Sequence, residues 1–554
     1  MYQHIATAAA TAATAVTAAA ALTPMASVTF QQSSSPSAMG FLEERDLSAV
    51  PQIPEYYKGK TLFITGGSGF MGKVLVEKLL YSCSELDKIY LLLRTKKNVR
   101  PEDRLQDIFS SPCFDRLRQE RPGLFESKVF VVSGDASEIG LGLSVEDRAL
   151  LVNRVNIIFH VAASVRFDDP LEVAARLNLR GTREVVELAK EVRFLEVLLH
   201  VSTSYANTNR DPIEEMLYPP LADWRDTLQV CEETDHYTLK VLTPKYLGEL
   251  PNTYTFTKQL AEHVVYEQRG HLPAVIMRPS IVISTHREPM PGWIENFNGP
   301  VGIFVASGKG ILRSMYSNPE LVSDYMPVDV AIKAFIAAAW ARGTKPLDPS
   351  DDIPVYNCCA GNLNNITVAA LLDLGRRVVA DMPLNDALWP AGGSITTYQT
   401  VYYINVLLVH LLPALFIDFI LWIAGKPPML VKVQRRIYIA NLALRYYLTQ
   451  QWTFTNKNFV KLRSSLQEAD KEDFYYEMEG IDKEEFFKHS CMGGRKYLLK
   501  EKDEDLPKAK AHYHRMIIVD IVVRCLFYGF VLWRLLHVTF VQDLLQNIYT
   551  LIFE

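Results

Sequence analysis

The sequence predicts an α/β fold built on a doubly wound parallel sheet, followed by a mainly helical C-terminal domain. Three observations lead to this prediction. Short apolar runs alternate with helical stretches from Lys60 to about Arg278, a glycine-rich turn follows the first run, and the alternation is lost beyond about residue 360. Short strands that alternate with helices are typical of a parallel sheet with helices on both faces.

The candidate strands are short and rich in β-forming residues, and each ends in small or polar residues. They are Leu62–Thr65, Ile89–Leu93, Val129–Ser133, Ile157–Val161, Val197–Val201 and Ala274–Met277. In an open parallel sheet the carboxyl ends of the strands form the crevice in which ligands bind. The residues just beyond these ends are therefore the first candidates for a functional site.

The first strand runs into a turn that contains Gly66, Gly67, Ser68, Gly69, Phe70, Met71 and Gly72 and then into an amphipathic helix. Gly66 can adopt a turn conformation that a side chain would obstruct, and Gly69 lets backbone N–H groups approach a pyrophosphate. Gly72 lets the helix pack closely on the strand, and the helix N-terminus adds positive potential. We therefore predict that these seven residues bind a dinucleotide; the alternative is an ordinary glycine turn.

The ends of the second and third strands bear on which dinucleotide is bound. Arg94 stands where an NAD enzyme carries an acid for the ribose hydroxyls, and a cation there suits a 2′-phosphate. Lys96 and Lys97 add positive charge, so the sequence predicts NADPH rather than NADH, with a solvated basic loop as the alternative. Asp135, at the third strand end, either accepts from the adenine amine or belongs to a turn.

Tyr254 and Lys258 are the candidate catalytic pair, because residues four apart lie on one face of a helix. A phenol with a pKa of about 10 is a poor acid–base group at neutral pH, and an adjacent ammonium stabilises the phenolate. The spacing alone is weak evidence, since Tyr56 and Lys60 repeat it before the first strand. The position of Tyr254 and Lys258 after the fifth strand supports a catalytic role for this pair and not for the other.

That strand ends at Ser202-Thr203-Ser204, where a hydroxyl can bind the same carbonyl oxygen as the phenol. We choose Thr203 as this hydroxyl. Ser202 and Ser204 flank it, and a shift of one residue would change the choice. In the alternative interpretation either serine caps the end of the strand.

Together these motifs resemble those of the alcohol-forming fatty acyl-CoA reductases of the insect type, which are extended short-chain dehydrogenase/reductases. The wide spacing Gly66-x-x-Gly69-x-x-Gly72 is typical of that superfamily. The resemblance runs from about Ile53 to the end of the chain and rests on five stretches: Thr65–Gly72, His160–Phe167, His200–Asn207, Tyr254–Lys258 and Arg278–Val282. Ser68 stands where the family often has Thr, which keeps a hydroxyl.

The resemblance implies a Rossmann domain that uses NADPH to reduce a long-chain acyl-CoA to a primary alcohol. Two hydride transfers through an aldehyde, with release of CoA, belong to that implication. Carried over residue by residue, the glycines would bind the pyrophosphate and Arg94 the 2′-phosphate. Tyr254 and Lys258 would hold the reacting carbonyl and the ribose, and Thr203 would help to stabilise the oxyanion.

Three further residues follow from the same resemblance. Ala162 would line the nicotinamide side of the cleft, and Asn178 matches a helix asparagine that supports the site, although an ordinary polar helix position is a fair alternative. His160 fits a packed strand residue better than a catalyst. Two other classes stay open, a membrane-anchored hydroxysteroid dehydrogenase-like or sugar-nucleotide enzyme and a non-catalytic Rossmann binding protein.

Composition argues against other functions. A formal net charge of -5 over 554 residues gives no reason to propose nucleic acid as a partner. The seven cysteines form no C-x-x-C pair and have no histidine at ligand spacing, so we expect reduced, buried thiols and no structural metal.

The sequence divides into four parts, with two segments that interrupt the strand–helix alternation. Residues 211–251 are predicted to form a lid or a substrate-side insertion. Residues 293–313 read as a flexible loop in which Lys309 and Arg313 either hold a phosphorylated substrate tail or are simply solvated. The four parts are a disordered Ala/Thr/Ser-rich tail at 1–50, the NADPH-binding reductase domain at 51–360, a helical domain at 361–515 with an apolar segment at 401–424, and a membrane anchor at 516–541.

The two apolar segments make the C-terminal part membrane-associated. Residues 401–424 are long enough to span a bilayer but contain Pro413 and Asp418 and precede a basic cluster, so a re-entrant hairpin, an interfacial helix and a buried core helix all stay open. Residues 516–541 are better suited to cross, with Asp520 one turn from Arg524 to pair with it.

We expect an integral or tightly held protein of the endoplasmic reticulum or peroxisome membrane, with its catalytic domain in the cytosol. Its expected partners are the lipid membrane and a long-chain acyl-CoA, and a homo-oligomer stays open.

Overall fold

A computed structural model describes residues 50–96, 98–361, 366–537, 543, 547 and 548 of the chain. Almost all of the predicted tail at 1–50 lies outside the described residues. Lys97, one of the predicted cofactor-side cations, and residues 538–541 of the predicted anchor lie outside them too.

A seven-stranded parallel sheet with the strand order β10-β6-β5-β4-β1-β2-β3 forms the centre of the fold. The chain runs outward from β1 in one direction and then in the other, which creates a switch point between β1 and β4. The doubly wound fold is confirmed, and each of the six predicted strands is present with ends within two residues. The strands are β1 (Thr61–Thr65), β2 (Lys88–Leu93), β3 (Val129–Ser133), β4 (Ile157–His160), β5 (Val197–Val201), β6 (Ala274–Pro279) and β10 (Val355–Cys358).

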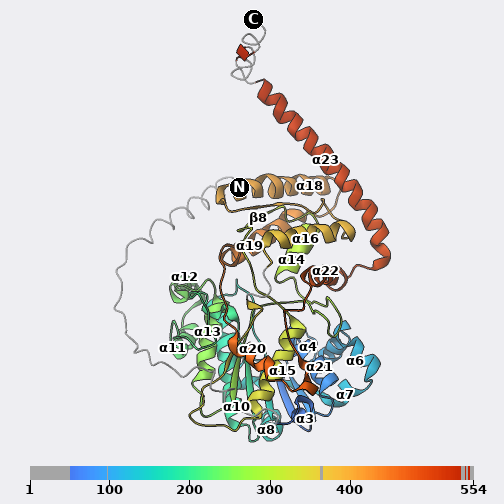
Figure 1. Cartoon of the computed structure of the whole chain (residues 1–554). Helices are drawn as coiled ribbons and strands as arrows, with labels where there is room; N and C mark the ends of the chain where they lie inside the picture. The colour runs from blue at the N-terminus through green and yellow to red at the C-terminus, as the bar shows by residue number, and fades with distance from the viewer. Residues whose placement is uncertain (1–49, 97, 362–365, 538–542, 544–546, 549–554) are drawn as a thin grey trace. The chain divides into compact units, whose positions relative to one another are not determined.

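Helices cover both faces of this sheet (Figure 1). Successive side chains of a strand point to opposite faces, so Ile64 of β1 packs in one core while Phe63 packs in the other. The first core lies under α4 (Phe70–Ser82) and α15 (Val328–Gly343). The second lies under α8 (Val145–Arg154), α10 (Gly181–Glu191) and α13 (Thr253–Tyr266).

Shorter elements complete the first 360 residues. Two small parallel pairs join β7 (Ile281–Ile283) to β9 (Tyr325–Pro327) and β8 (Ser314–Tyr316) to β11 (Ser394–Thr396). The remaining helices here are α3 (Ile53–Tyr57), α5 (Pro101–Phe109), α6 (Asp115–Glu120), α7 (Leu124–Lys128), α9 (Leu171–Ala174), the π-helix η4 (Ala175–Arg180), α11 (Trp224–Glu233), α12 (His236–Leu247) and α14 (Pro300–Gly308).

Beyond residue 360 the described chain is mainly helical, as predicted. Two of its helices, α20 and α21, return to pack on α15, so this part does not stand apart from the sheet. The division at residue 360 therefore stays a prediction. The helices are α16 (Val368–Asp381), α17 (Gln399–Asn405), the π-helix η7 (Val406–Leu411), α18 (Leu412–Ile423), α19 (Leu430–Thr449), α20 (Lys457–Ser464), α21 (Glu468–Phe474), α22 (Lys483–Gly493), the π-helix η8 (Gly494–Leu498) and α23 (Leu506–Leu536).

One buried carboxylate links the 211–251 segment to both parts of the chain. Glu215 accepts a hydrogen bond from the backbone N–H group of Asn357 in β10. It also accepts from the backbone N–H groups of Asn458 and Phe459 at the start of α20. Burial raises its pKa to about 7, although these bonds act in the opposite direction. The base of the segment is therefore fixed to the sheet and to the C-terminal helices.

The prediction of a free cationic loop at 293–313 is wrong. Residues 300–308 form α14, and both cations are paired within the chain. The Lys309 ammonium lies 2.8 Å from a Glu501 carboxylate oxygen. The Arg313 guanidinium lies 3.8 Å from Asp520 and over the Trp389 ring.

The cysteines are free, as expected, but not all of them are buried. Cys525 on α23 is exposed and Cys231 is half-buried, whereas the other five are buried.

A fully buried ion pair fixes α13 to the sheet. The Arg278 guanidinium on β6 donates to both carboxylate oxygens of Glu262 on α13, each at 2.7 Å. It also donates to the backbone carbonyls of Glu214 and Met216 at the base of the 211–251 segment. The helix that carries the predicted catalytic pair is therefore held by the strand next to β5.

Replacing Arg278 by Met leaves the Glu262 carboxylate buried without its partner, so we expect the free energy of unfolding to fall by about 3–5 kcal/mol. The double variant Arg278→Met/Glu262→Leu removes both charges and should recover part of this loss, although the carbonyls of Glu214 and Met216 still lose their donor. Denaturant titration of the detergent-purified variants measures both. A double variant as unstable as the single one would contradict this account of the pair.

Candidate active site

The turn between β1 and α4 needs glycine for two separate reasons. Gly66 has a φ of +76°, and a Cβ atom there would lie 2.7 Å from the backbone nitrogen of Ala162. A Cβ atom on Gly72 would lie 2.2 Å from the Gly66 carbonyl oxygen, so α4 packs directly on the turn. The turn conformation predicted for Gly66 and the close packing predicted for Gly72 are confirmed, and their role in binding a pyrophosphate stays a prediction.

The same turn leaves room for an anion. Gly69 is the N-cap of α4 and has no capping side chain, so the first backbone N–H groups of the helix are available to a ligand. Of the other predicted cofactor residues, Gly67 lies against Leu91, Phe70 stacks on Trp293 with ring centroids 5.2 Å apart, and Met71 packs against the first core. The arrangement fits a pyrophosphate cradle.

Two guanidinium groups lie beside this cradle, those of Arg94, predicted from the sequence, and Arg104, which was not predicted. Arg94 follows β2, is 56% exposed and lies 2.9 Å from an Asp135 carboxylate oxygen. Arg104, on α5, donates to the Arg94 carbonyl oxygen at 2.5 Å and to the Ser68 hydroxyl at 3.3 Å. Burial and the nearby charge of Arg94 lower the pKa of Arg104. This pair of cations suits a phosphate better than Arg94 alone.

Both oxygens of Asp135 are engaged within the chain. One accepts from the backbone N–H and the hydroxyl of Ser137, and the other pairs with Arg94. Burial raises the pKa of Asp135, but these bonds outweigh it and lower the pKa below its ordinary value. The geometry favours the turn alternative, and an adenine contact stays a prediction.

The structure brings Tyr254, Lys258 and Thr203 together at the carboxyl end of β5. Tyr254 lies in the first turn of α13, which Asn252 caps by accepting from the Thr255 N–H at 3.0 Å. The nearby Thr203 hydroxyl lowers the pKa of its phenol, against the larger effect of burial. The Ser204 hydroxyl instead donates to the Arg278 carbonyl, as a strand-end cap would. Thr203 also caps a short helix, accepting from the Tyr205 N–H at 3.2 Å and donating to the Pro279 carbonyl at 3.4 Å. The choice of Thr203 therefore rests on its effect on the phenol and stays a prediction.

Lys258 does not act on the phenol in the way that the spacing suggested. Its ammonium donates to the Val201 carbonyl oxygen at 2.6 Å and is 2% exposed. Burial raises the pKa of Tyr254 to about 12, and the bond with Thr203 opposes this. Burial lowers the pKa of Lys258 to about 8, opposed by the charge of Glu262. The sequence predicted that the ammonium would lower the pKa of the phenol, but this pKa is raised instead.

Asn178 joins the loop after β4 to the catalytic helix. It lies in the π-helix η4 and is 1% exposed. Its side-chain oxygen accepts from the Ser164 N–H at 2.8 Å, and its amide donates to the Ser164 carbonyl and to the Thr257 hydroxyl at 3.0 Å. Asn178 therefore has the supporting contacts predicted for it.

His160 is a packed strand residue whose hydrogen bonds determine its tautomer. The Thr182 hydroxyl donates to the Asn178 carbonyl at 2.7 Å, so it accepts from Nε2–H of His160. Nδ1 of His160 then accepts from the Thr65 hydroxyl at 2.8 Å, and the Thr65 oxygen accepts from the Ala162 N–H at 3.3 Å. This chain of bonds reaches from η4 to the backbone of Ala162 beside the glycine turn.

His200 on β5 lies next to His160 on β4 but, in the described part of the chain, lacks the hydrogen bonds that His160 makes. The two rings lie 5.3 Å apart, and neither nitrogen of His200 has a hydrogen-bond partner among the described residues. Burial and the charge of Lys258 lower the pKa of His200 well below its ordinary value and that of His160 to about 3. Both histidines are therefore neutral at physiological pH.

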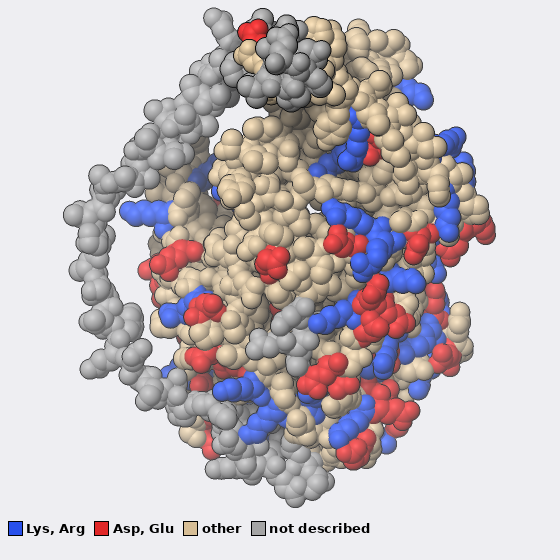
Figure 2. Space-filling view, turned by 45° about the horizontal axis from the view of Figure 1, so that its top comes forward, with Lys and Arg blue, Asp and Glu red and all other residues tan. Residues whose placement is uncertain are grey.

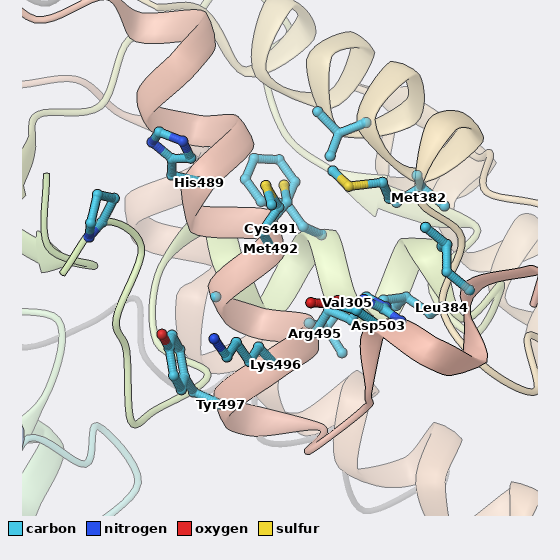
Figure 3. A pocket seen from close by; sticks show the side chains of 16 residues that line it. Val305, Met382, Leu384, His489, Cys491, Met492, Arg495, Lys496, Tyr497 and Asp503 are labelled. Carbon is cyan, nitrogen blue, oxygen red and sulfur yellow. Dashed lines mark hydrogen bonds and ion pairs between the residues drawn. The ribbon is translucent and has the colours of Figure 1, made fainter. Parts of the chain in front are cut away.

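A separate pocket of about 340 Å³ lies between α14, α16 and α22 (Figure 3). Met382 and Leu384 face Cys491 and Met492 across it, and Arg495 lies beside Val305 and Asp503. None of the predicted site residues lines this pocket.

Comparison with known proteins places this arrangement in a family. Two family models, both described as "Male sterility protein" and the first named for NAD binding, match residues 64–335 and 409–501. "Fatty acyl-CoA reductase 1" of Xenopus laevis is 39% identical over 467 residues, which is 84% of this chain and 89% of that protein.

Other relatives agree. "Fatty acyl-CoA reductase 1" of Homo sapiens is 37% identical over 87% of this chain and 93% of its own length. "Fatty acyl-CoA reductase wat" of Drosophila melanogaster is 36% identical over 88% of this chain and 94% of its own length. The chain belongs to the fatty acyl-CoA reductase family.

Solved structures support the fold. A reductase domain of a nonribosomal peptide synthetase from Mycobacterium tuberculosis is similar with a TM-score of 0.53 and 19% identity, over 82% of this chain and 94% of that one. At this identity the similarity shows the extended Rossmann-type fold and no more. The first family model supports a nicotinamide cofactor.

The buried histidines generate a prediction about acid stability. The pKa of His200 in the folded protein is depressed below 6.5, so the unfolded chain binds more protons and stability is lost as the pH falls below about 6.5. His200→Leu removes this term, and between pH 6.5 and 4.5 we expect it to lose roughly 2–3 kcal/mol less than the unaltered protein.

Denaturant titrations at the two pH values measure this difference. The exposed His271→Leu is the matched control and should follow the unaltered protein. Equal acid sensitivity of all three proteins would show that His200 is not buried in its neutral form.

Proposed function

We propose that this protein is an NADPH-dependent reductase that converts a long-chain fatty acyl-CoA to a primary alcohol through an aldehyde, with release of CoA. The observation that carries this proposal is the group formed by Tyr254, Thr203 and Lys258 at the carboxyl edge of the sheet, beside a glycine turn shaped for a dinucleotide. The names of the relatives support the substrate class.

The cofactor would be held by residues on three elements. The N–H groups at the start of α4 face the pyrophosphate, and the close contact of Gly66 with Ala162 sets the nicotinamide side against the loop after β4. Arg94 and Arg104 offer two guanidinium groups to the 2′-phosphate, which favours NADPH over NADH. When bound, NADPH supplies the hydride.

The hydroxyls of Tyr254 and Thr203 act on the substrate oxygen. Both donate hydrogen bonds to the carbonyl, where negative charge develops as the carbon is reduced. A phenol with a pKa of about 12 stays protonated at neutral pH, so Tyr254 is a hydrogen-bond donor and can give its proton to an alkoxide, which is a far stronger base. Lys258 keeps its proton below about pH 8, and its ammonium is available to the ribose hydroxyls of the cofactor.

The proposal includes a membrane location, in the endoplasmic reticulum or peroxisome with the catalytic domain in the cytosol. Two helical segments, Gln399–Ile423 and Asp503–Leu536, are long and apolar enough to cross a bilayer. The second is exposed along its apolar part. Between residues 516 and 536 it carries two cations: Arg524, which pairs with Asp520 at 2.7 Å as predicted from the sequence, and Arg534 in its last turn. We assign the main anchor to this helix.

Tyr254→Phe should abolish alcohol formation, by at least about 100-fold, because it removes the proton donor and one oxyanion contact. Binding of NADPH, followed by fluorescence titration, should change little since the glycine turn is untouched. Tyr447→Phe is a matched control at a neighbouring tyrosine, whose hydroxyl accepts from Asn252, and should keep most of the activity. Turnover retained in Tyr254→Phe would refute the assignment.

Arg94→Glu and Arg104→Glu should each raise the KM for NADPH by roughly 10- to 100-fold, because a charge-assisted contact worth about 1.5–3 kcal/mol is replaced by repulsion. The KM for NADH, which lacks the 2′-phosphate, should change much less. Arg193→Glu makes the same charge change at an exposed position two residues after the end of α10 and serves as the control. An unchanged preference for NADPH in Arg104→Glu would exclude this residue from the phosphate site.

A further inference from the structure

The segment formed by α17, η7 and α18 presents an apolar face to the outside of the molecule. Only 17% of its most apolar stretch is buried, so the alternative of a buried core helix is wrong. A contiguous exposed apolar face of this length marks an interaction surface in a natural protein. The face consists of Ile404, Leu407, Leu408, Leu411, Leu412, Leu415, Phe416, Phe419, Ile420, Trp422 and Ile423, each at least 36% exposed.

The polar side chains of the segment point the other way, into the protein. Nε2 of His410 accepts from the backbone N–H groups of Arg313 and Ser314 at 2.9 and 3.1 Å. The Asp418 carboxylate accepts from three N–H groups at the start of α19, those of Met429, Leu430 and Val431, at 2.8 to 2.9 Å. Both side chains are less than 9% exposed, so the segment is fastened to the protein at two points along one side.

Helix α19, to which Asp418 binds the segment, would enter a bilayer only at a high cost in free energy. Lys432, Arg435 and Arg436 of α19 are exposed, and so is Lys426 in the preceding loop. Each would cost roughly 3 kcal/mol at a bilayer centre. A crossing by α18 would bring these cations towards the hydrocarbon, whereas a helix that lies flat leaves them at the headgroups. Asp418 is the only acid between residues 399 and 449, and it is buried.

The apolar face also shares an attachment point with the proposed anchor. Arg313, whose N–H bonds to His410, pairs through its guanidinium with Asp520 of α23. Up to that level α23 packs on the body, with Tyr513 accepting from the Ala391 N–H at 3.1 Å, and beyond it the apolar side chains of α23 are exposed. Figure 1 shows α18 across the end of the body from which α23 projects. The upper part of the view in Figure 2 is mostly tan, with Lys and Arg side chains at its right edge and a few charged side chains near its centre.

We propose that residues 399–423 lie flat in the interface of a membrane that contains anionic lipid, as a second lipid contact beside α23 and not as a crossing. The apolar face enters the boundary between headgroups and acyl chains, and the cations from residue 426 to residue 436 meet the lipid phosphates. This inference rests on the membrane location proposed above and is independent of the reaction.

The depth of three positions along the segment tests this arrangement. Leu408 and Ile423 are 15 residues apart, which is roughly 22 Å along a helix, with Phe416 between them. In the full-length protein carrying Cys525→Ser, Leu408→Cys, Phe416→Cys and Ile423→Cys are labelled one at a time with an environment-sensitive fluorophore. The proteins are reconstituted into vesicles of phosphatidylcholine and phosphatidylserine with a quencher near the carboxyl or the methyl end of the acyl chain.

We expect all three positions to be quenched more strongly by the shallow quencher than by the deep one, in the same ratio. A deep Phe416 between shallow Leu408 and Ile423 would overturn the proposal in favour of a crossing or a re-entrant hairpin. Absence of quenching at all three would overturn it in favour of cover by protein.

Two controls separate this inference from the proposals on which it rests. Leu526→Cys on α23 should be quenched most by the deep quencher, and if it is not, the proposed anchor fails. Phe194→Cys, exposed on the sheet domain, should be quenched by neither. Acyl-CoA reduction by the same preparations tests the reductase function independently of every depth measurement.

Discussion

The candidate site depends on one buried ammonium group, that of Lys258. Lys258 is almost inaccessible to solvent, and the described chain gives it one backbone carbonyl, that of Val201, at hydrogen-bond distance. Burying an ammonium is costly unless it is well bonded, and an ammonium has three donors. The fold therefore holds a cation short of partners next to the place proposed for a ribose and a carbonyl. A ligand that brings hydrogen-bond acceptors to this place would bind more tightly, because it would satisfy the free N–H donors of Lys258.

The surroundings of Lys258 are built to hold α13 against that cost. The Arg278–Glu262 ion pair fastens the helix one turn further on, and Asn178 fastens its first turns through Thr257. The hydrogen-bond chain through His160 fixes the loop on the other side, down to the backbone of Ala162.

Local patterns explain what the sequence could reveal. The seven strands are short apolar runs between turns, and the glycine turn is conspicuous because side chains at Gly66 and Gly72 would collide with backbone. Tyr254 and Lys258 could be paired because helical spacing is a local property. Arg104 was missed because it lies on α5, away from any strand end, and reaches the turn only through the packing of that helix.

Partners distant in sequence explain what was misjudged. Lys309 and Arg313 read as free cations because Glu501 and Asp520 lie about 200 residues away. Asp418 reads as a charge inside an apolar helix until α19 folds back and presents its N-terminus. The pKa of Tyr254 followed burial and not its neighbouring ammonium, and the degree of burial depends on the whole surrounding core.

The clamp at Glu215 limits how the 211–251 segment can move. Its base is bonded to β10, to α20 and, through two carbonyls, to Arg278, so the root of the segment cannot swing without breaking buried bonds. Its outer helices α11 and α12 carry most of the exposed side chains. If the segment acts as the predicted lid, its movement is confined to α11 and α12 and leaves the sheet undisturbed.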